Sequence, residues 1–442
     1  MPLKFVTCVI VVFASLCASS AQTSELRERR NRAAAAFPDG ILLLHARSSF
    51  DLAADGFRQD PIFYYYTGLE NTVGALLAID GRSRESWLFL QSQDPFGDPG
   101  LRPEVSPGPN SARQLEIDHV VDWGELEPFL ASRASSPARL YYSRNRFSLD
   151  EVPVAFLGNE ATVEPLWLNI IKRRWPAFVL TNVGPALSDL MAVQSATEVK
   201  SVRAAASATV AAVKAGMRAI KPGASQRSVE VEVTNACWEA GAHGPSFWPW
   251  ALAGENGVFP KPWLTLSRYD HLDSAMKAGD LVRLDVGCEW EHYSGDLGRT
   301  VPVSGHYTPE QRETWNVFVS AYLAGAKVLR EGATVDQVFD AWRTELLKHR
   351  SSVKTVAARR AIEQWSDRKN VPFWQVHTMN LEAGLPKGGL RAGTTIDFEP
   401  IASIDGQGYY LEDMYWITKD GAENLTPNVP YTAEEIEAAM KH

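Results

Sequence analysis

Cysteine, basic charge and long apolar stretches are all scarce in this sequence. Four cysteines in 442 residues are too few for a disulfide scaffold. Acidic residues outnumber basic ones by 53 to 44, which argues against nucleic acid as a partner. Internal repeats and low-complexity tracts are also absent. The composition is that of a globular protein, and its length predicts two domains.

One short apolar run does occur, near the start of the chain. Lys4 precedes the apolar residues Phe5–Leu16, and small residues lead up to Ala21. This is the pattern of a secretory signal peptide over residues 1–21, cleaved before Gln22. The run is shorter than the roughly 20 residues that cross a bilayer. We therefore expect a secreted or periplasmic protein that has no membrane association after signal removal.

Removal of this signal leaves a chain that is still poorer in cysteine and in basic charge. Lys4 is the only charged residue of the signal, so 43 basic and 53 acidic residues remain, a net charge of −10. Two cysteines are lost with the signal, and Cys237 and Cys288 remain. The oxidising compartment allows these two to pair, but the sequence does not decide whether they do.

Apolar periodicity predicts a first domain of mixed α and β structure over residues 22–180. A cluster of proline and glycine at 93–110 indicates a long loop. Helices are expected at 25–37 and 163–174, and strands at 40–46, 62–69, 73–79, 86–91 and 138–143.

A second domain is expected from residue 184 to 442, opening with a long helix. Ser195 or Thr197 is the expected N-cap of this helix, and the sequence Lys-Pro-Gly at 221–223 is its expected stop. From there to the end the pattern is mixed α and β.

Two carboxylates occur close to apolar strands in this domain. Residues 280–287 alternate like a strand that ends near Asp285, and residues 293–305 are its expected hairpin partner, with Asp296 near its start. Two carboxylates side by side in an apolar setting cost several kcal/mol unless a proton, a base or a metal compensates. Exposure on a hairpin is the alternative interpretation.

The last third of the chain adds further candidate ligands. Glu399 follows an apolar strand, Glu412 lies inside another, and His377 lies upstream of both. With Asp285 and Asp296 they supply four oxygen donors and one imidazole. Bridging carboxylates suit two divalent ions, and one nitrogen donor fits Mn, Co or Zn better than Ca.

Several motifs in both halves of the chain resemble those of one superfamily. They are "FRQDPIFYYYTGLEN" in the first half, and "AGDLVRLDVGCEWEHYSGDLGRTVPVSG", "LRAGTTIDFEP" and "YYLEDMYWIT" in the second. Through them the chain is similar to the pita-bread metallopeptidases, aminopeptidase P and prolidase in particular. The resemblance implies an α/β (α+β) protein, with a creatinase-like (ribonuclease H-like) amino-terminal domain followed by a pita-bread catalytic domain.

The resemblance also implies roles for the five candidate ligands. Asp285 would chelate one metal, Asp296 and Glu412 would bridge two, and His377 with Glu399 would hold the other. A water between the ions would be the nucleophile, and Glu399 would carry its proton to the leaving amine. The implied activity is exopeptidase cleavage of short peptides, at Xaa-Pro bonds in particular.

Two other function classes stay open. One is a metal-free C–N hydrolase resembling creatinase, and the other is a non-catalytic peptide-binding protein on the same fold. Short peptides are the expected partners, and a homodimer is left open.

The sequence departs from the superfamily pattern at three positions. Gly384 and Lys261 occupy positions where histidines are usual, and Tyr410 stands where an arginine usually precedes the bridging glutamate by two residues. His271 is a candidate catalytic replacement for the missing histidine near Lys261. These departures concern substrate handling, whereas the metal ligands match.

The sequence can be aligned with the superfamily pattern in two ways around the histidine ligand. His377 lies 22 residues before Glu399, a spacing that also suits the second, non-ligand histidine of the superfamily; Asn370 would then occupy the ligand position. We prefer His377 as the ligand, because the residues that follow it keep a leucine and a glutamate at the expected spacing.

Aromatic residues provide a candidate substrate wall. His243, Trp248 and Trp250 lie where the substrate pocket of the superfamily begins, and Trp374 is a further candidate. Flat apolar side chains of this kind can hold a proline ring. Packing in the core is the alternative role for these aromatics.

Overall fold

The computed structural model describes residues 25–47, 57–90, 105–134, 138–143, 166–258, 275–371, 373–378 and 388–441. The chain forms two compact units, one up to Leu190 and the other from Met191 onward. The division falls at the end of helix α6 (Gly184–Met191), whereas the sequence pattern places the boundary before this helix.

Unit 1 contains a six-stranded mixed sheet with the strand order β4-β3-β2-β1-β5-β6. The β1–β2 and β2–β3 pairs are antiparallel and the other pairs are parallel. Four strands expected from the sequence, at 40–46, 73–79, 86–91 and 138–143, are confirmed as β1, β2, β3 and β5. The strands are β1 (Gly40–His45), β2 (Leu76–Asp80), β3 (Glu85–Leu90), β4 (His119–Asp122), β5 (Ala138–Tyr142) and β6 (Phe178–Asn182).

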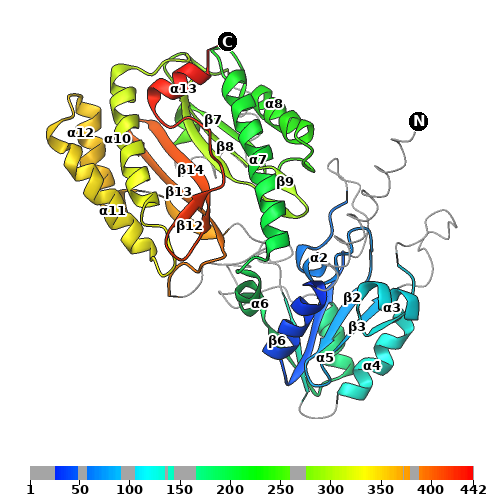
Figure 1. The fold of residues 1–442 in the computed structure, drawn as a ribbon. Coiled ribbons are helices and arrows are strands. Elements are labelled where there is room, and N and C mark those ends of the chain that lie inside the picture. The colour runs from blue at the N-terminus through cyan, green and yellow to red at the C-terminus, as the bar shows by residue number, and fades with distance from the viewer. Residues whose placement is uncertain are drawn as a thin grey trace, which may run out of the picture. The chain divides into compact units, whose positions relative to one another are not determined.

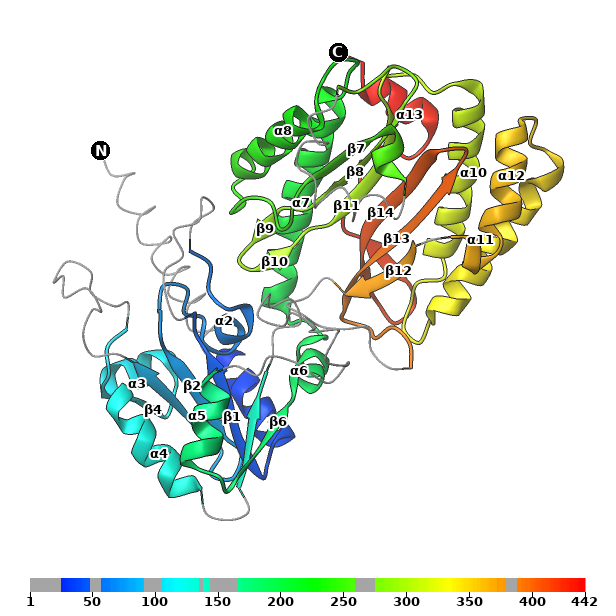
Figure 2. The ribbon, with the colours of Figure 1, turned by 180° about the vertical axis from the view of Figure 1, so that it is seen from behind.

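Helices flank this sheet (Figures 1 and 2). The expected first helix is confirmed over residues 25–36, and the expected helix at 163–174 is confirmed from Leu166 onward. Most of the loop expected at 93–110 lies outside the described residues. The labelled helices are α2 (Pro61–Thr67), α3 (Pro109–Leu115), α4 (Leu126–Arg133) and α5 (Leu166–Arg174), with a 3₁₀ turn η1 (Trp123–Glu125).

The strand expected at 62–69 is wrong, because this segment forms helix α2. The side chain of Asp60 caps the helix by accepting hydrogen bonds from the backbone N–H of Ile62 (3.0 Å) and of Phe63 (2.9 Å). A proline occupies its first turn, and Gly68 ends it in the left-handed conformation, with φ 68°. Stop and start signals at both ends therefore outweigh the strand propensity of the aromatic run.

Unit 2 is built on an antiparallel sheet with the strand order β12-β13-β14-β11-β8-β7, and β15 pairs with β14. A small hairpin, β9 (Glu289–Trp290) with β10 (Tyr293–Ser294), separates β8 from β11. The strands are β7 (Trp250–Ala253), β8 (Leu281–Val286), β11 (Leu297–Pro302), β12 (Phe373–Thr378), β13 (Thr395–Ile404), β14 (Gln407–Ile417) and β15 (Ala422–Asn424).

Two groups of helices cover this sheet. Helices α7 and α8 pack beside β7 and β8, α10 and α12 pack beside the β13–β14 hairpin, and α11 packs on α10 (Figures 1 and 2). Ser195 caps α7 in a capping box with Glu198, which confirms one of the two expected N-caps. The helices are α7 (Ala196–Ala219), α8 (Gln226–Glu239), α10 (Pro309–Ala326), α11 (Val335–Lys348), α12 (Val356–Trp365) and α13 (Ala433–Ala439); the 3₁₀ turns are η3 (Gly254–Gly257), η5 (His349–Ser351) and η6 (Arg368–Asn370).

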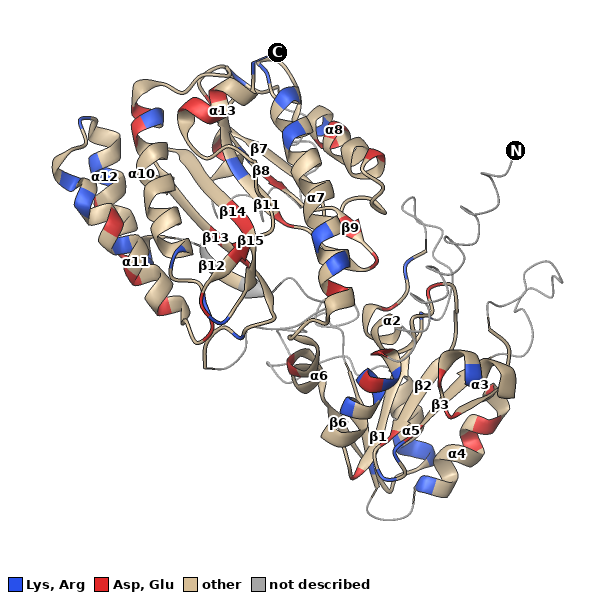
Figure 3. Cartoon of the chain, in the orientation of Figure 1, with Lys and Arg blue, Asp and Glu red and all other residues tan. Residues whose placement is uncertain are grey.

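An aromatic core holds α10, α11 and α12 together. The ring of Phe318 lies edge-on to Trp342 at 4.8 Å and to Trp365 at 5.3 Å, and all three are fully buried. On their outer faces, α11 and α12 carry both basic and acidic residues (Figure 3). None of the helices in the described part of the chain has the length and hydropathy needed to span a bilayer.

Candidate metal centre

Asp285 lies on β8, and Asp296 lies directly before the neighbouring strand β11, close to where the sequence predicts a hairpin partner. Strand β8 pairs antiparallel with β11, and Asp285 is opposite Gly298, two residues after Asp296. Together with Glu412 they present oxygen atoms that all lie within 4.8 Å of one another. Asp285 is 7% exposed and Asp296 is partly exposed. Three carboxylates, from β8, from the residue before β11 and from β14, therefore converge at one point on the sheet.

Glu399 and Glu412 are joined by Tyr410. The Tyr410 hydroxyl hydrogen-bonds to Oε2 of Glu399 (3.2 Å) and to Oε2 of Glu412. Tyr410 and Glu412 are fully buried, and Glu399 is 7% exposed. The residue that replaces the expected arginine is thus in direct contact with two of the predicted metal ligands.

Asp397 is a further buried acid that the sequence reasoning missed. It precedes Glu399 by two residues on β13, and Phe398 between them stacks on Tyr322 of α10 at 4.7 Å. Because side chains alternate along a strand, Asp397 and Glu399 share the face away from α10. Asp397 is fully buried and within hydrogen-bonding reach of the Glu412 carboxyl. The alternation in "TIDFEP" was the signal that could have identified it.

Arg283 is a second buried charged residue that the sequence reasoning missed. It precedes Asp285 by two residues on β8, so the same alternation of side chains applies to it. Its Nη2 donates to Oδ2 of Asp285 at 2.6 Å. The guanidinium lies 4.3 Å from the Tyr410 ring centre and 5.3 Å from that of Trp250. Arg283 is 5% exposed, so this is a buried cation beside the carboxylates.

Four of these acids are costly to charge in this setting unless cations are present. Burial raises the pKa of Asp285, and it raises the pKa of Asp296, Asp397 and Glu412 well above the usual range, because neighbouring carboxylates add to the cost of charge. Oδ1 of Asp296 and Oε1 of Glu412 are buried, and no donor among the described residues reaches either oxygen. Buried oxygen donors of this kind fit divalent metal ions.

A second buried ion pair, Arg299 with Asp413, holds the backbone at Glu412. Arg299 donates to the Glu412 backbone carbonyl at 2.7 Å and to Oδ1 of Asp413 at 2.8 Å. Arg299 and Asp413 are both fully buried, and Asp413 also accepts from the hydroxyl of Tyr431 at 2.7 Å. This network fixes the backbone of β14 where Glu412 projects to the other face.

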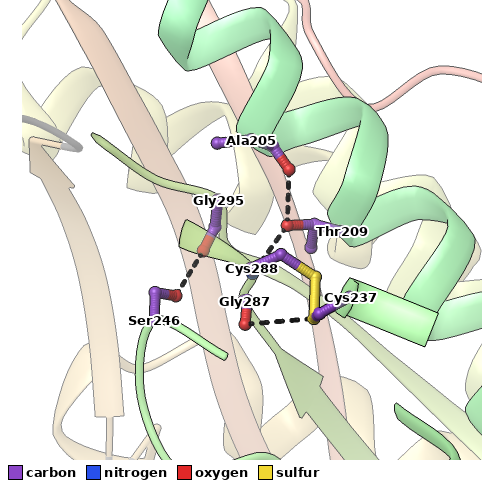
Figure 4. Close-up of a disulfide and its surroundings, with 7 residues drawn as sticks. All are labelled: Ala205, Thr209, Cys237, Ser246, Gly287, Cys288 and Gly295. Carbon is purple, nitrogen blue, oxygen red and sulfur yellow. Dashed lines mark hydrogen bonds between the residues drawn. A yellow bond between two sulfur atoms is a disulfide. The ribbon is translucent and has the colours of Figure 1, made fainter. Parts of the chain in front are cut away.

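A disulfide fixes the turn that follows Asp285. Cys237 of α8 pairs with Cys288, which settles the question that the sequence left open. The backbone N–H of Cys288 donates to Oγ1 of Thr209 at 2.9 Å, and that hydroxyl donates to the carbonyl of Ala205 at 2.8 Å (Figure 4). The turn between β8 and β9 is thereby tied to α7 and α8.

The structure locates only some of the residues in the predicted histidine site. The backbone of His377 lies in β12 opposite Asp397. Asn370, the alternative ligand, is exposed at the end of η6. The side chains of His377 and Trp374, and all of His271, Lys261 and Gly384, lie outside the described residues. The register places His377 beside the acids, and its ligand role stays a prediction.

The residues predicted to form the substrate wall differ in their exposure and in their distance from the carboxylates. His243 is half exposed, with Nδ1 3.8 Å from Oε1 of Glu289, and Trp248 is partly buried. Trp250 lies opposite Asp285 in the β7–β8 pair, and its ring faces Arg283. Among the described candidates for the substrate wall, Trp250 is the one next to the carboxylates.

This fold and its carboxylate group define a metallopeptidase of the pita-bread type. Residues 200–419 match metallopeptidase family M24, and residues 26–141 match the aminopeptidase P N-terminal domain. The chain belongs to metallopeptidase family M24. The predicted family, the two-domain α/β fold and the metallo-exopeptidase class are thereby confirmed, and the family implies divalent metal ions at this centre.

Relatives align over almost the whole chain. The Xaa-Pro aminopeptidase of Escherichia coli strain K12 is 24% identical over 91% of this chain and 94% of its own length. That of Haemophilus influenzae is 25% identical over 94% and 97%. The solved structure of a single-residue variant of Escherichia coli aminopeptidase P has a TM-score of 0.74 at 24% identity and covers 95% of this chain and 98% of its own. This structural likeness shows the fold.

Proposed function

We propose that this protein is an exported exopeptidase that removes the amino-terminal residue from short Xaa-Pro peptides at a dinuclear metal centre. The observation that carries the proposal is the convergence of buried carboxylates on one face of the unit 2 sheet. The names of the two bacterial relatives support the Xaa-Pro preference. The signal pattern over residues 1–21 and the disulfide support export to a secreted or periplasmic location.

Charge balance supports two divalent ions. Five carboxylates and one guanidinium sum to −4, which two divalent cations would neutralise; the residues counted are Asp285, Asp296, Asp397, Glu399, Glu412 and Arg283. Asp285, Asp296, Glu399 and Glu412, with His377, are the proposed ligands. Mn, Co or Zn fits this mixture of oxygen donors and one imidazole.

The bound ions would activate a water molecule and polarise the scissile carbonyl. Glu399 would accept the proton of the attacking water and donate it to the leaving amine, while the Tyr410 hydroxyl fixes the position of its carboxylate. Arg283 would hold Asp285 in place through Oδ2. Trp250 would supply an apolar wall beside the centre, suited to a proline ring.

A peptide panel tests this function. Xaa-Pro tripeptides and matched tripeptides with alanine in place of proline are incubated with the Mn-loaded protein, and released amino acid is quantified. We expect release from the proline series, and its loss in Asp296→Asn. Hydrolysis that persists without metal would favour the metal-free C–N hydrolase, and metal binding without cleavage of any peptide would favour the peptide-binding protein.

The substrate-handling candidates outside the described residues need a separate assay. If His271 or Lys261 stabilises the developing charge, replacing it with alanine should cost about 2.7–4 kcal/mol, or two to three decades in turnover. Unchanged Xaa-Pro turnover in both variants would remove these two residues from the proposed site.

A further inference from the structure

Asp397 differs from the other buried acid of the β13–β14 hairpin in what surrounds it. Asp413 is neutralised by Arg299 at 2.8 Å and accepts hydrogen bonds from Tyr322 (3.1 Å) and Thr426 (3.1 Å). Asp397 lies instead next to the carboxyl of Glu412, and the carboxylates of Asp296 and Glu399 are also close enough to act on it. The first acid has the environment of a structural ion pair, and the second has the environment of a cation site.

The register of the hairpin places Asp397 inside the carboxylate group. Asp397 is opposite Met414 on β14, and the sulfur of Met414 accepts from the backbone N–H of Asp296 at 3.4 Å. Glu412, two residues before Met414, is within hydrogen-bonding reach of Asp397. Asp397 thus lies next to Glu412, one of the proposed ligands.

A second observation supports a cation at this point. Oε1 of Glu412 is fully buried, and no described donor reaches it. A buried carboxylate oxygen without a donor costs several kcal/mol unless a positive charge faces it. The carboxylate of Asp397 adjoins this oxygen donor.

We propose that Asp397 is a ligand of the metal centre, in addition to Asp285, Asp296, His377, Glu399 and Glu412. A further carboxylate makes the donor set richer in hard oxygen, which raises the affinity for Mn²⁺ relative to that for Zn²⁺. The inference rests on the proposed function, because it requires that the centre binds divalent ions.

The test compares metal binding by wild type, Asp397→Asn and a matched control, Asp405→Asn. Asp405 lies in the turn of the same hairpin with φ 51°, a conformation that asparagine also adopts. Equilibrium dialysis with Mn²⁺ and with Zn²⁺ gives the ions bound per chain and the dissociation constants. We expect Asp397→Asn to weaken Mn²⁺ binding at least about tenfold, to weaken Zn²⁺ binding less, and the control to match wild type.

Thermal unfolding separates a ligand from a structural residue. Without metal, Asp397→Asn removes one of several mutually repelling buried acids, so its Tm should equal or exceed that of wild type. With Mn²⁺ its Tm should be lower, because weaker binding stabilises the folded state less. Asp397→Ser gives the same two comparisons if the asparagine variant does not fold.

Several results would contradict the inference. A loss of Mn²⁺ affinity smaller than about tenfold would exclude Asp397 as a ligand. An equal loss of affinity for both metals would exclude the proposed effect of Asp397 on metal preference. An equal fall of Tm with and without metal would make Asp397 a structural residue. Wild type that binds no divalent ion would refute the proposed centre itself, whereas two ions in both proteins with equal affinity would refute only the role of Asp397.

Discussion

At the scale of single residues, the centre depends on a buried cation as well as on its acids. Arg283 bonds to Asp285 and packs its guanidinium against Tyr410 and Trp250. Its single positive charge offsets part of the repulsion among the carboxylates. Removing one member of such a buried pair leaves the other charge uncompensated in a region of low dielectric constant.

Arg283→Met should therefore lower the free energy of unfolding of the metal-free protein by about 3–5 kcal/mol. The matched control is Arg203→Met, which breaks the exposed pair between Arg203 and Glu423 (2.7 Å) and should cost no more than about 1 kcal/mol. Denaturant unfolding measures both. Equal losses in the two variants would show that burial of the Arg283 pair has no special energetic role.

Glu399→Gln should reduce turnover on Xaa-Pro peptides by about 10²–10⁴, because glutamine cannot accept the proton of the attacking water. Glu331→Gln, at an exposed position of unit 2, is the control and should leave turnover unchanged. Rates at saturating peptide, together with the metal content of each protein, distinguish lost proton transfer from lost metal. A variant with wild-type turnover would exclude Glu399 as the proton carrier.

At the scale of secondary-structure elements, close approach of β11 and β14 positions the centre. Gly298 on β11 lies opposite Asp285 on one side and opposite Glu412 on the other. The Tyr410 ring packs directly over it, so that a Cβ at this position would lie 1.9 Å from the ring. Only glycine lets the Tyr410 hydroxyl reach Glu399 and Glu412 from this direction.

Gly298→Ala should displace Tyr410, lower the free energy of unfolding by about 1–3 kcal/mol and weaken metal binding. Gly421→Ala, where an added Cβ meets no atom within 4 Å, is the control. Denaturant unfolding and Mn²⁺ titration report the two effects. Unchanged values for both quantities in Gly298→Ala would contradict the close packing of Tyr410 on this strand.

The disulfide acts at the same scale, because it closes a loop of 51 residues between α8 and the turn after β8. Replacing Cys237 and Cys288 together with serine should lower the free energy of unfolding by about 2–4 kcal/mol, since the unfolded chain then regains freedom. Wild type in reductant should reach the same stability. No change on either treatment would mean that the two cysteines do not pair in solution.

The elements that carry the centre could be predicted from sequence better than the residues that complete it. Alternation in β8 and β14 was sufficient to place Asp285 and Glu412, because acids inside apolar strands are unusual. Asp397 precedes Glu399 by two residues on β13, and Arg283 precedes Asp285 by two residues on β8, so alternation places each on the face of its neighbouring ligand. Alternation alone does not tell a metal ligand from a charge that pairs within the sheet. The pairing of Cys237 with Cys288 has no local signal, since the fold brings the two segments together.

Helix α2 shows a different limit. An aromatic run has strand propensity, but Asp60 starts a helix, Gly68 ends it, and the seven residues between them form about two helical turns. The caps were present in the sequence and outweighed the run. Local signals of opposite meaning cannot be ranked without the packing that decides between them.

At the scale of the whole molecule, the centre links stability to pH. Burial raises the pKa of Glu412 well above its ordinary value of 4.5, with Glu399 adding to the shift. The folded protein therefore keeps a proton that the unfolded chain releases. The stability that this provides is fully present below about pH 4.5 and is lost as the pH rises through the raised pKa.

Glu412→Gln removes this dependence. In the metal-free state, the Tm of the variant minus that of wild type should become more positive as the pH rises from about 4.5 to about 8. Taking the difference cancels the contribution of surface carboxylates common to both proteins. A difference that is constant with pH would contradict the buried, protonated state of Glu412.

The central claim is that the converging carboxylates of unit 2 hold the metal ions that make this chain a peptidase. The most direct test is a titration of the chelated protein with Mn²⁺, following hydrolysis of an Xaa-Pro tripeptide against ions bound per chain. We predict no hydrolysis without metal and a rate that reaches its plateau at about two ions per chain, with Asp296→Asn failing to reach it. Hydrolysis at the full rate in the metal-free protein would contradict the account.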